Sequence, residues 1–216
     1  RDPEMSRGLG DVYKRQTLLQ PLARPGDARF KNISGDNRLD SDDRTYIGNP
    51  NPDVIYGGNI ELGYKGFDFA LYFQGVAGND IWTGTKALLR QTSMTNLLAE
   101  TYTDAWRKAG DKTDVFGISR KDDNDNYRTS SWYVQDGSFL KIKSVQLGYT
   151  FPKKWIEATR VASSLRLYVS AENLFTITKF KYMDPEVPNG SALNMGMENL
   201  GYPNPRTFTV GVNVQF

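Results

Sequence analysis

The chain has 216 residues and a net charge of +2, and it contains no cysteine and no histidine. The missing cysteines exclude disulfides, zinc thiolate sites and thiol nucleophiles, and the missing histidines remove the usual general base and the most common transition-metal ligand. The charge offers no concentrated basic face, so we expect no nucleic acid partner, and no apolar run approaches the ~18 residues of a membrane-spanning helix.

Residues 1–16 lack the apolar core of a secretory signal peptide. Within them, SRGLGDVYKRQ at residues 6–16 resembles translated sequencing-adapter read-through, so this segment is predicted to be non-native. An exported protein without a leader would be a fragment of a longer chain, and we expect that here.

Residues 17–53 are predicted to be a loop, because Asp, Asn, Gly and Pro dominate most of the stretch. Within it, NISGDNRLDSDD at residues 32–43 follows the spacing of the EF-hand calcium loop. Asn32 replaces the usual first Asp and Asn37 replaces the turn glycine, so a loop closed by Asx turns without an ion is the alternative. The predicted Ca²⁺ ligands are Asn32, Ser34, Asp36, Asp40 and Asp43, with the backbone carbonyl oxygen of Arg38.

Strands are predicted over residues 54–64 and 67–77, where apolar and polar residues alternate with the period of a strand. The parity of the apolar set changes from even to odd across Lys65 and Gly66. A two-residue hairpin requires this change, because the residues that flank its turn pair directly and point to the same side. The two apolar faces therefore merge into one.

Residues 78–136 form a long polar connection, in which residues 88–108 could hold one or two helices. Its tryptophans could stack on the rings of a sugar substrate, although packing inside the loop is the interpretation we prefer. These candidate substrate residues are Trp82, Trp106 and Trp132.

Two further strands are predicted over residues 139–151 and 165–171. In the first of them, Lys141 and Lys143 share the parity of the apolar residues. Either a β-bulge shifts the phase or the lysines lie above the hydrocarbon of a membrane, and we prefer the second interpretation.

Residues 206–216 alternate apolar with uncharged polar side chains and end on Phe216. They cover the roughly 9–11 residues that a tilted strand needs to cross a bilayer. An aromatic last residue after such a strand resembles the carboxy-terminal signal of outer-membrane barrel proteins.

The connections between the strands alternate long and short, so the short ones share one edge of an antiparallel sheet. Aromatic residues gather at that edge, as in the girdle of a membrane barrel. We therefore predict an all-β fold: an antiparallel transmembrane β-barrel segment over residues 54–216, with long extracellular loops that include residues 17–53. About five strands cannot close a barrel, so more strands are expected. The alternative is a secreted, calcium-stabilised β-sandwich that binds glycans.

The polar face of the predicted sheet would line the barrel lumen. Glu61 and Asp68 could suggest a glycosidase pair, but no supporting pocket is evident, so no enzyme is predicted. The predicted lumen-facing residues are Asn59, Glu61, Asp68, Tyr72, Gln74, Arg166, Tyr168 and Glu172.

A series of sequence blocks resembles, in the same order, the carboxy-terminal part of the SusC/RagA family of TonB-dependent outer-membrane transporters. The resemblance covers residues 25–216. The blocks are GDARFKNISGD (26–36), DRTYIGNPNPD (43–53), YKGFD (64–68), FQGVAGNDI (73–81), DGSFLKIKSVQLGYT (136–150), SAENLFT (170–176) and YPNPRTF (202–208).

This resemblance implies a barrel of about 22 strands, closed by an amino-terminal plug, in the outer membrane of a Gram-negative cell. Its expected cargo is an oligosaccharide or a peptide, moved by binding and gated passage without bond chemistry. The expected partners are a SusD-like surface lipoprotein that acts as a lid, outer-membrane lipid, and TonB, which would act through an amino-terminal part that this chain lacks.

Overall fold

The computed structural model describes residues 19–89, 96–118, 121–157, 161–186 and 194–216. The segment predicted to be non-native, residues 1–16, lies outside them. Among the described residues, no helix has the length and apolar character to cross a membrane. In chain order the elements are η1 (Ser41–Asp43), β1 (Val54–Tyr64), β2 (Phe67–Ala77), β3 (Asp80–Thr83), α2 (Gly84–Leu88), α3 (Ala99–Thr103), η2 (Ser131–Tyr133), β4 (Val134–Asp136), β5 (Phe139–Thr150), α4 (Lys153–Glu157), β6 (Ser164–Thr178), β7 (Met197–Glu198) and β8 (Thr207–Gln215).

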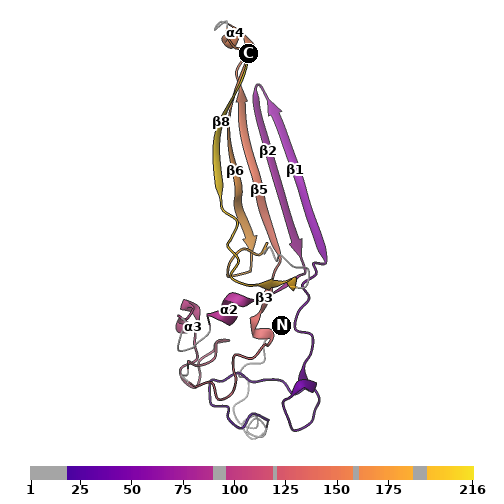
Figure 1. The fold of residues 1–216 in the computed structure, drawn as a ribbon, viewed down its shortest axis with the longest axis vertical. Helices are drawn as coiled ribbons and strands as arrows, with labels where there is room; N and C mark the ends of the chain where they lie inside the picture. Colours follow the sequence, from indigo (N-terminus) through magenta and orange to yellow (C-terminus); the bar gives the residue numbers. More distant parts are fainter. Residues whose placement is uncertain (1–18, 90–95, 119–120, 158–160, 187–193) are drawn as a thin grey trace. The chain divides into compact units, whose positions relative to one another are not determined.

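Five long strands form one antiparallel sheet in the order β1-β2-β5-β6-β8 (Figure 1). The predicted hairpin joins β1 to β2, with Tyr64 paired to Phe67. Its two turn residues, Lys65 and Gly66, have φ values of 47° and 90°, as a turn that follows the right-handed twist of the strands requires. Three shorter strands form a second sheet in the order β4-β3-β7.

The cross-strand register places the apolar residues of all five long strands on one face. One row across the sheet contains Ile60, Leu71, Val145, Ala171 and Phe208. This face is open rather than packed into a core, since the side chains of β8 on it are 46–81% exposed. The β-sandwich alternative, which needs such faces turned inward on each other, is therefore contradicted.

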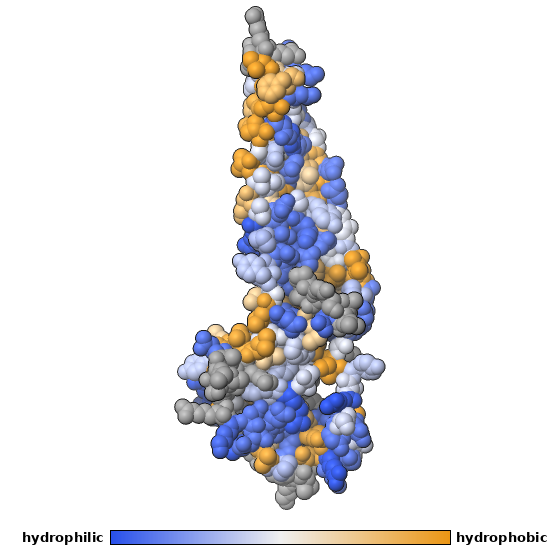
Figure 2. All heavy atoms as spheres, viewed as in Figure 1, coloured by the Kyte–Doolittle hydropathy of each residue, from blue (hydrophilic) through white to orange (hydrophobic). Residues whose placement is uncertain are grey.

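Hydrophilic and hydrophobic residues separate visibly over the strands (Figure 2). Aromatic rings meet beside the β1–β2 turn, as predicted for the short-turn edge. The centroids of Phe67 and Tyr149 lie 4.6 Å apart, and those of Tyr149 and Phe151 lie 5.0 Å apart.

The lysines of β5 correct one expectation. The register of β5 against β2 shifts by one residue around Lys143, and Lys141 pairs with Gln74 of the polar face. A β-bulge of this kind reverses the alternation of a strand. Lys141 and Lys143 therefore turn to the polar face. A β-bulge explains their positions, and the expectation that they lie above the hydrocarbon of a membrane on the apolar side was wrong.

Contacts divide the chain into two units, one of Arg1–Gly48 and Trp82–Val134 and the other of Asn49–Ile81 and Gln135–Phe216. The second unit contains the five-stranded sheet. In the first unit, the long connection after β3 forms an interior of its own, with an aromatic cluster of Phe116, Tyr127, Trp132 and Tyr133.

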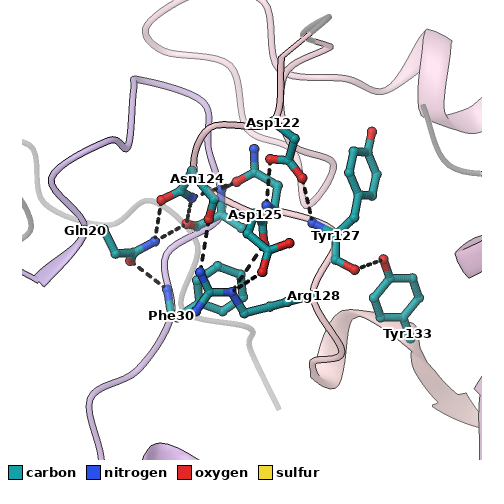
Figure 3. Close-up of polar contacts among 10 residues, drawn as sticks. Gln20, Phe30, Asp122, Asn124, Asp125, Tyr127, Arg128 and Tyr133 are labelled. Atoms are coloured by element: carbon teal, nitrogen blue, oxygen red, sulfur yellow. Dashed lines mark hydrogen bonds and ion pairs between the residues drawn. The ribbon is translucent and has the colours of Figure 1, made fainter. Parts of the chain in front are cut away.

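A buried polar network joins distant parts of the first unit (Figure 3). The side chain of Gln20 donates to Asn124 Oδ1 at 2.9 Å and accepts from the backbone N–H of Phe30 at 3.0 Å. Asn126 Oδ1 accepts from the backbone N–H of Ala28 at 2.8 Å. Because each amide is paired inside the network, its burial carries little desolvation cost.

Candidate functional site

The polar face of the five-stranded sheet carries all of the side chains that were predicted to share it. Asn59 lies opposite Tyr72, and Asp68 and Tyr168 flank Gly148 on neighbouring strands. Alternate residues of a strand point to opposite faces, so the pairing fixes their common side. That this face lines a lumen remains a prediction.

An ion pair crosses the width of three strands on this face. Arg166 of β6 donates from Nε to Asp68 Oδ1 of β2 at 2.9 Å, and from Nη2 to Oδ2. Gly148 of β5 lies beneath, where any Cβ would overlap the guanidinium and the carboxylate. The guanidinium also lies 5.1 Å from the ring centroid of Tyr168. A bidentate pair forms only in this particular geometry. It therefore fixes both charged side chains against the polar face.

Other polar groups on the face stay open to solvent. Asn59 Nδ2 donates to Glu61 Oε1 at 2.8 Å, and Tyr72 Oη donates to Gln74 Oε1 at 3.3 Å. Asn59, Glu61, Tyr72 and Glu172 are all exposed. The exposed polar atoms of these four side chains can hydrogen-bond water or a polar solute.

A cluster of buried charges occupies the face where β2 and β5 meet. Lys141 Nζ lies 2.6 Å from Asp184 Oδ2 and 2.8 Å from Glu186 Oε2. Lys143 Nζ lies 2.8 Å from Glu186 Oε1. The side chain of Lys141 is only 2% exposed and that of Asp184 only 11%. The connection after β6 therefore returns to the sheet and places its carboxylates against two lysines of the polar face.

Hydrogen bonds outweigh burial in setting the charge of these carboxylates. Burial by itself raises the pKa of both Asp184 and Glu186, but hydrogen bonds from Lys141 hold each pKa below its ordinary value. Glu186 also accepts from Gln74 Nε2 at 2.7 Å and Asn204 Nδ2 at 3.2 Å. Both carboxylates are thus charged at neutral pH.

Sequence patterning did not find this cluster. Asp184 and Glu186 lie in a connection without periodicity, 43 and 45 residues from Lys141. One feature of the sequence did point to it: two lysines of β5 fall at positions where the alternation of the strand places apolar residues. Charged side chains at such positions require either a β-bulge or acidic partners.

The acidic loop closes on itself through hydrogen bonds between its side chains and its own backbone. Asp43 Oδ1 accepts from the backbone N–H groups of Ile33 at 2.7 Å and Ser34 at 3.0 Å. The hydrogen bond from the backbone N–H of Ser34, together with those from Ile33 and Asp40, lowers the pKa of Asp43. The amide nitrogen of Asn32 donates to the carbonyl oxygens of Asp36 and Arg38.

A calcium ion fits this arrangement poorly. The Asn32 amide donates to the Arg38 carbonyl oxygen, which was predicted as a calcium ligand. In the described part of the chain, no three Asp, Glu, His or Cys side chains gather closely enough to hold a metal ion. Calcium binding remains a prediction.

The tryptophans proposed for substrate stacking occupy different environments in the first unit. Trp132 packs 4.5 Å from Phe116, centroid to centroid, and Lys86 Nζ lies 3.4 Å from the centroid of its ring. Trp82 packs on Tyr133 at 5.8 Å. Both tryptophans are half-buried and pack against other side chains of the first unit.

Trp106 differs, because it lines a hollow of about 400 Å³. Gly26 lies directly against its ring, where a Cβ would overlap the indole. Tyr102 and Arg107 border the same hollow, with the guanidinium 5.3 Å from the tyrosine centroid. Contact with a substrate remains a prediction for all three tryptophans.

Comparison with known proteins gives the family. No family model matches the chain. TonB-dependent receptor P3 of Formosa agariphila is 35% identical over 198 residues, which cover 89% of this chain and 19% of the receptor. TonB-dependent receptor SusC of Bacteroides thetaiotaomicron is 26% identical over 204 residues, covering 94% of this chain and 19% of SusC. The chain spans about a fifth of the length of these relatives.

Solved structures show the same fold. The RagAB peptide importer in its closed-closed state matches with a TM-score of 0.67 at 20% identity, over 86% of this chain and 20% of that one. A structure of the RagAB peptide transporter matches with a TM-score of 0.65 at 21% identity, over 84% and 19%. The fold is therefore a segment of an antiparallel β-barrel. The chain is homologous, over most of its length, to the TonB-dependent receptors of the SusC/RagA family, as its sequence blocks predicted.

Proposed function

We propose that this chain supplies wall strands and outer loops to a TonB-dependent importer of the outer membrane. The observation that carries the proposal is the two-faced sheet, with one exposed apolar face and one polar face. In a bilayer the apolar side chains contact lipid tails, while the strands satisfy each other's backbone groups and the polar side chains face water. The relatives, which include a protein named SusC and a structure named as a peptide importer, support this role.

The cargo is an oligosaccharide or a peptide, moved by binding and gated passage. The open side chains on the polar face provide weak, multiple hydrogen bonds, which suit a solute that must also leave. Asp68 is held by Arg166, so the pair of Glu61 and Asp68 offers no general acid beside a nucleophile. A SusD-like lipoprotein and TonB are the proposed partners, by similarity to SusC.

Deleting the reading frame that contains this sequence would test the proposal. Cells would be grown on single oligosaccharide or peptide sources, with the gene returned on a plasmid as the control. We expect growth to fail on one cargo class and to recover with the plasmid, and the protein to appear in the outer-membrane fraction. A protein found in the medium, together with normal growth on every source, would contradict it.

A further inference from the structure

The segment of residues 180–186 lies against the polar face instead of extending away from the sheet. Phe180 is 5% exposed, and Pro185 is also buried. Glu186 contacts both β2, through Gln74, and β5, through Lys141 and Lys143. One short segment thus covers the wall at the β-bulge.

Ion pairs hold this segment more firmly than surface contacts would. The side chains of Lys141, Asp184 and Glu186 are 2%, 11% and 25% exposed. Removing one partner from a buried pair leaves an uncompensated charge, which is strongly unfavourable. By contrast, Lys179 and Asp136, just before the segment, form a 4.0 Å pair that is 87% and 45% exposed, and such a pair contributes little.

We propose that residues 180–186 form a strap that stays docked on the polar wall while Asp184 and Glu186 are charged, and is released when they are neutralised. The charged and polar groups that face the two carboxylates are Lys141 and Lys143 of β5, Gln74 of β2 and Asn204 of the connection before β8. Release exposes this part of the wall. Only that consequence, a wider path for solute, rests on the proposed import function.

The sign of the pH dependence follows from the lowered pKa values of Asp184 and Glu186, whose ordinary values are 3.8 and 4.5. A carboxyl group with a lowered pKa stabilises the docked form above its ordinary pKa, and this contribution is lost as the pH falls through the lowered value. The strap is therefore docked at neutral pH and released in acid. Glu186→Gln removes the charge at neutral pH and keeps an amide that can still bond its neighbours.

Hydrogen–deuterium exchange on the full-length receptor in detergent measures the docking directly. In E186Q at neutral pH, we expect amides of residues 180–186 to exchange at least about tenfold faster than in the wild type. The β1–β2 hairpin should keep its protection. K179Q, which removes the exposed pair on the same connection, is the matched control and should leave the strap unchanged.

A second measurement does not depend on the variant folding. The wild-type receptor is taken stepwise to acid pH, with rates corrected for intrinsic exchange, and the strap should lose protection before the hairpin. Wild-type protection of the strap in E186Q, or loss in acid only together with the hairpin, would overturn the proposal. Exchange measures docking rather than uptake, so failure of the strap and failure of import are distinguishable.

Discussion

Gly75 and Gly148 allow side chains to cross a strand and bond to the strand beyond it. Over Gly75, on the apolar face, Tyr56 Oη of β1 donates to the carbonyl oxygen of Phe139 on β5 at 3.1 Å. Over Gly148, on the polar face, the Arg166 guanidinium reaches Asp68. Each glycine thus fixes three strands in register, because a crossing side chain fits only where the middle strand lacks a Cβ.

Gly75→Ala is expected to destabilise the sheet by about 1–3 kcal/mol, the usual cost of overpacking. The new Cβ would overlap both the Phe139 carbonyl oxygen and the Tyr56 ring, and the carbonyl oxygen belongs to the backbone and cannot swing away. Gly63→Ala is the control, since its Cβ would meet only the carbonyl oxygen of Phe67 at 3.9 Å. Thermal unfolding in detergent would compare the two. Equal unfolding midpoints for the two variants would show that the contact of Tyr56 across Gly75 does not stabilise the sheet.

The long strands were predictable because their pattern is local. Alternation fixed β1, β2 and β8 to within a residue or two, and the parity change fixed the turn between β1 and β2. The bulge in β5 was not predictable from local pattern: the phase of the strand reverses where Lys141 and Lys143 meet carboxylates from a connection without periodicity. The aromatic interior around Trp132 forms from similarly distant residues, so composition identified the rings but not their packing.

In the acidic loop of residues 32–43, the side-chain group at position 32 distinguishes a loop closed by hydrogen bonds from a loop that binds a cation. Asn32 donates from its amide to the carbonyl oxygens of Asp36 and Arg38, so in this arrangement the amide bonds both oxygens. A carboxylate at this position could not donate, and the carbonyl oxygens would become ligands for an ion. Asn32→Asp is therefore expected to raise Ca²⁺ affinity about tenfold or more.

Calorimetric titration of Ca²⁺ into the receptor and the N32D variant would measure this difference. Asp42→Asn, which makes the reverse exchange of an amide for a carboxylate outside the predicted ligand set, is the control for charge alone. If the unchanged protein binds Ca²⁺ as tightly as N32D, the amide of Asn32 is not acting in place of the ion.

The two faces of the five-stranded sheet differ in polarity and therefore require different surroundings. Leu147 is 46% exposed on the apolar face, while its neighbour Gln146 lies on the polar face in the row of Glu61 and Ser170. In water an apolar face of this extent would be an aggregation or interaction surface. In a bilayer the same face needs no further cover, because lipid tails are as apolar as the side chains they contact.

Lysine substitutions on adjacent residues of β5 test this asymmetry. Leu147→Lys places a charge in lipid and should destabilise the folded receptor by roughly 1–3 kcal/mol, between the cost at the bilayer midplane and the smaller cost at the interface, because Leu147 lies two residues from Tyr149 of the aromatic edge. Gln146→Lys adds the same charge to the polar face and should cost much less, since water can solvate it. Urea unfolding of the full-length receptor in lipid vesicles would measure both variants. If Q146K destabilised the receptor as much as L147K, the apolar face could not be the one turned to lipid.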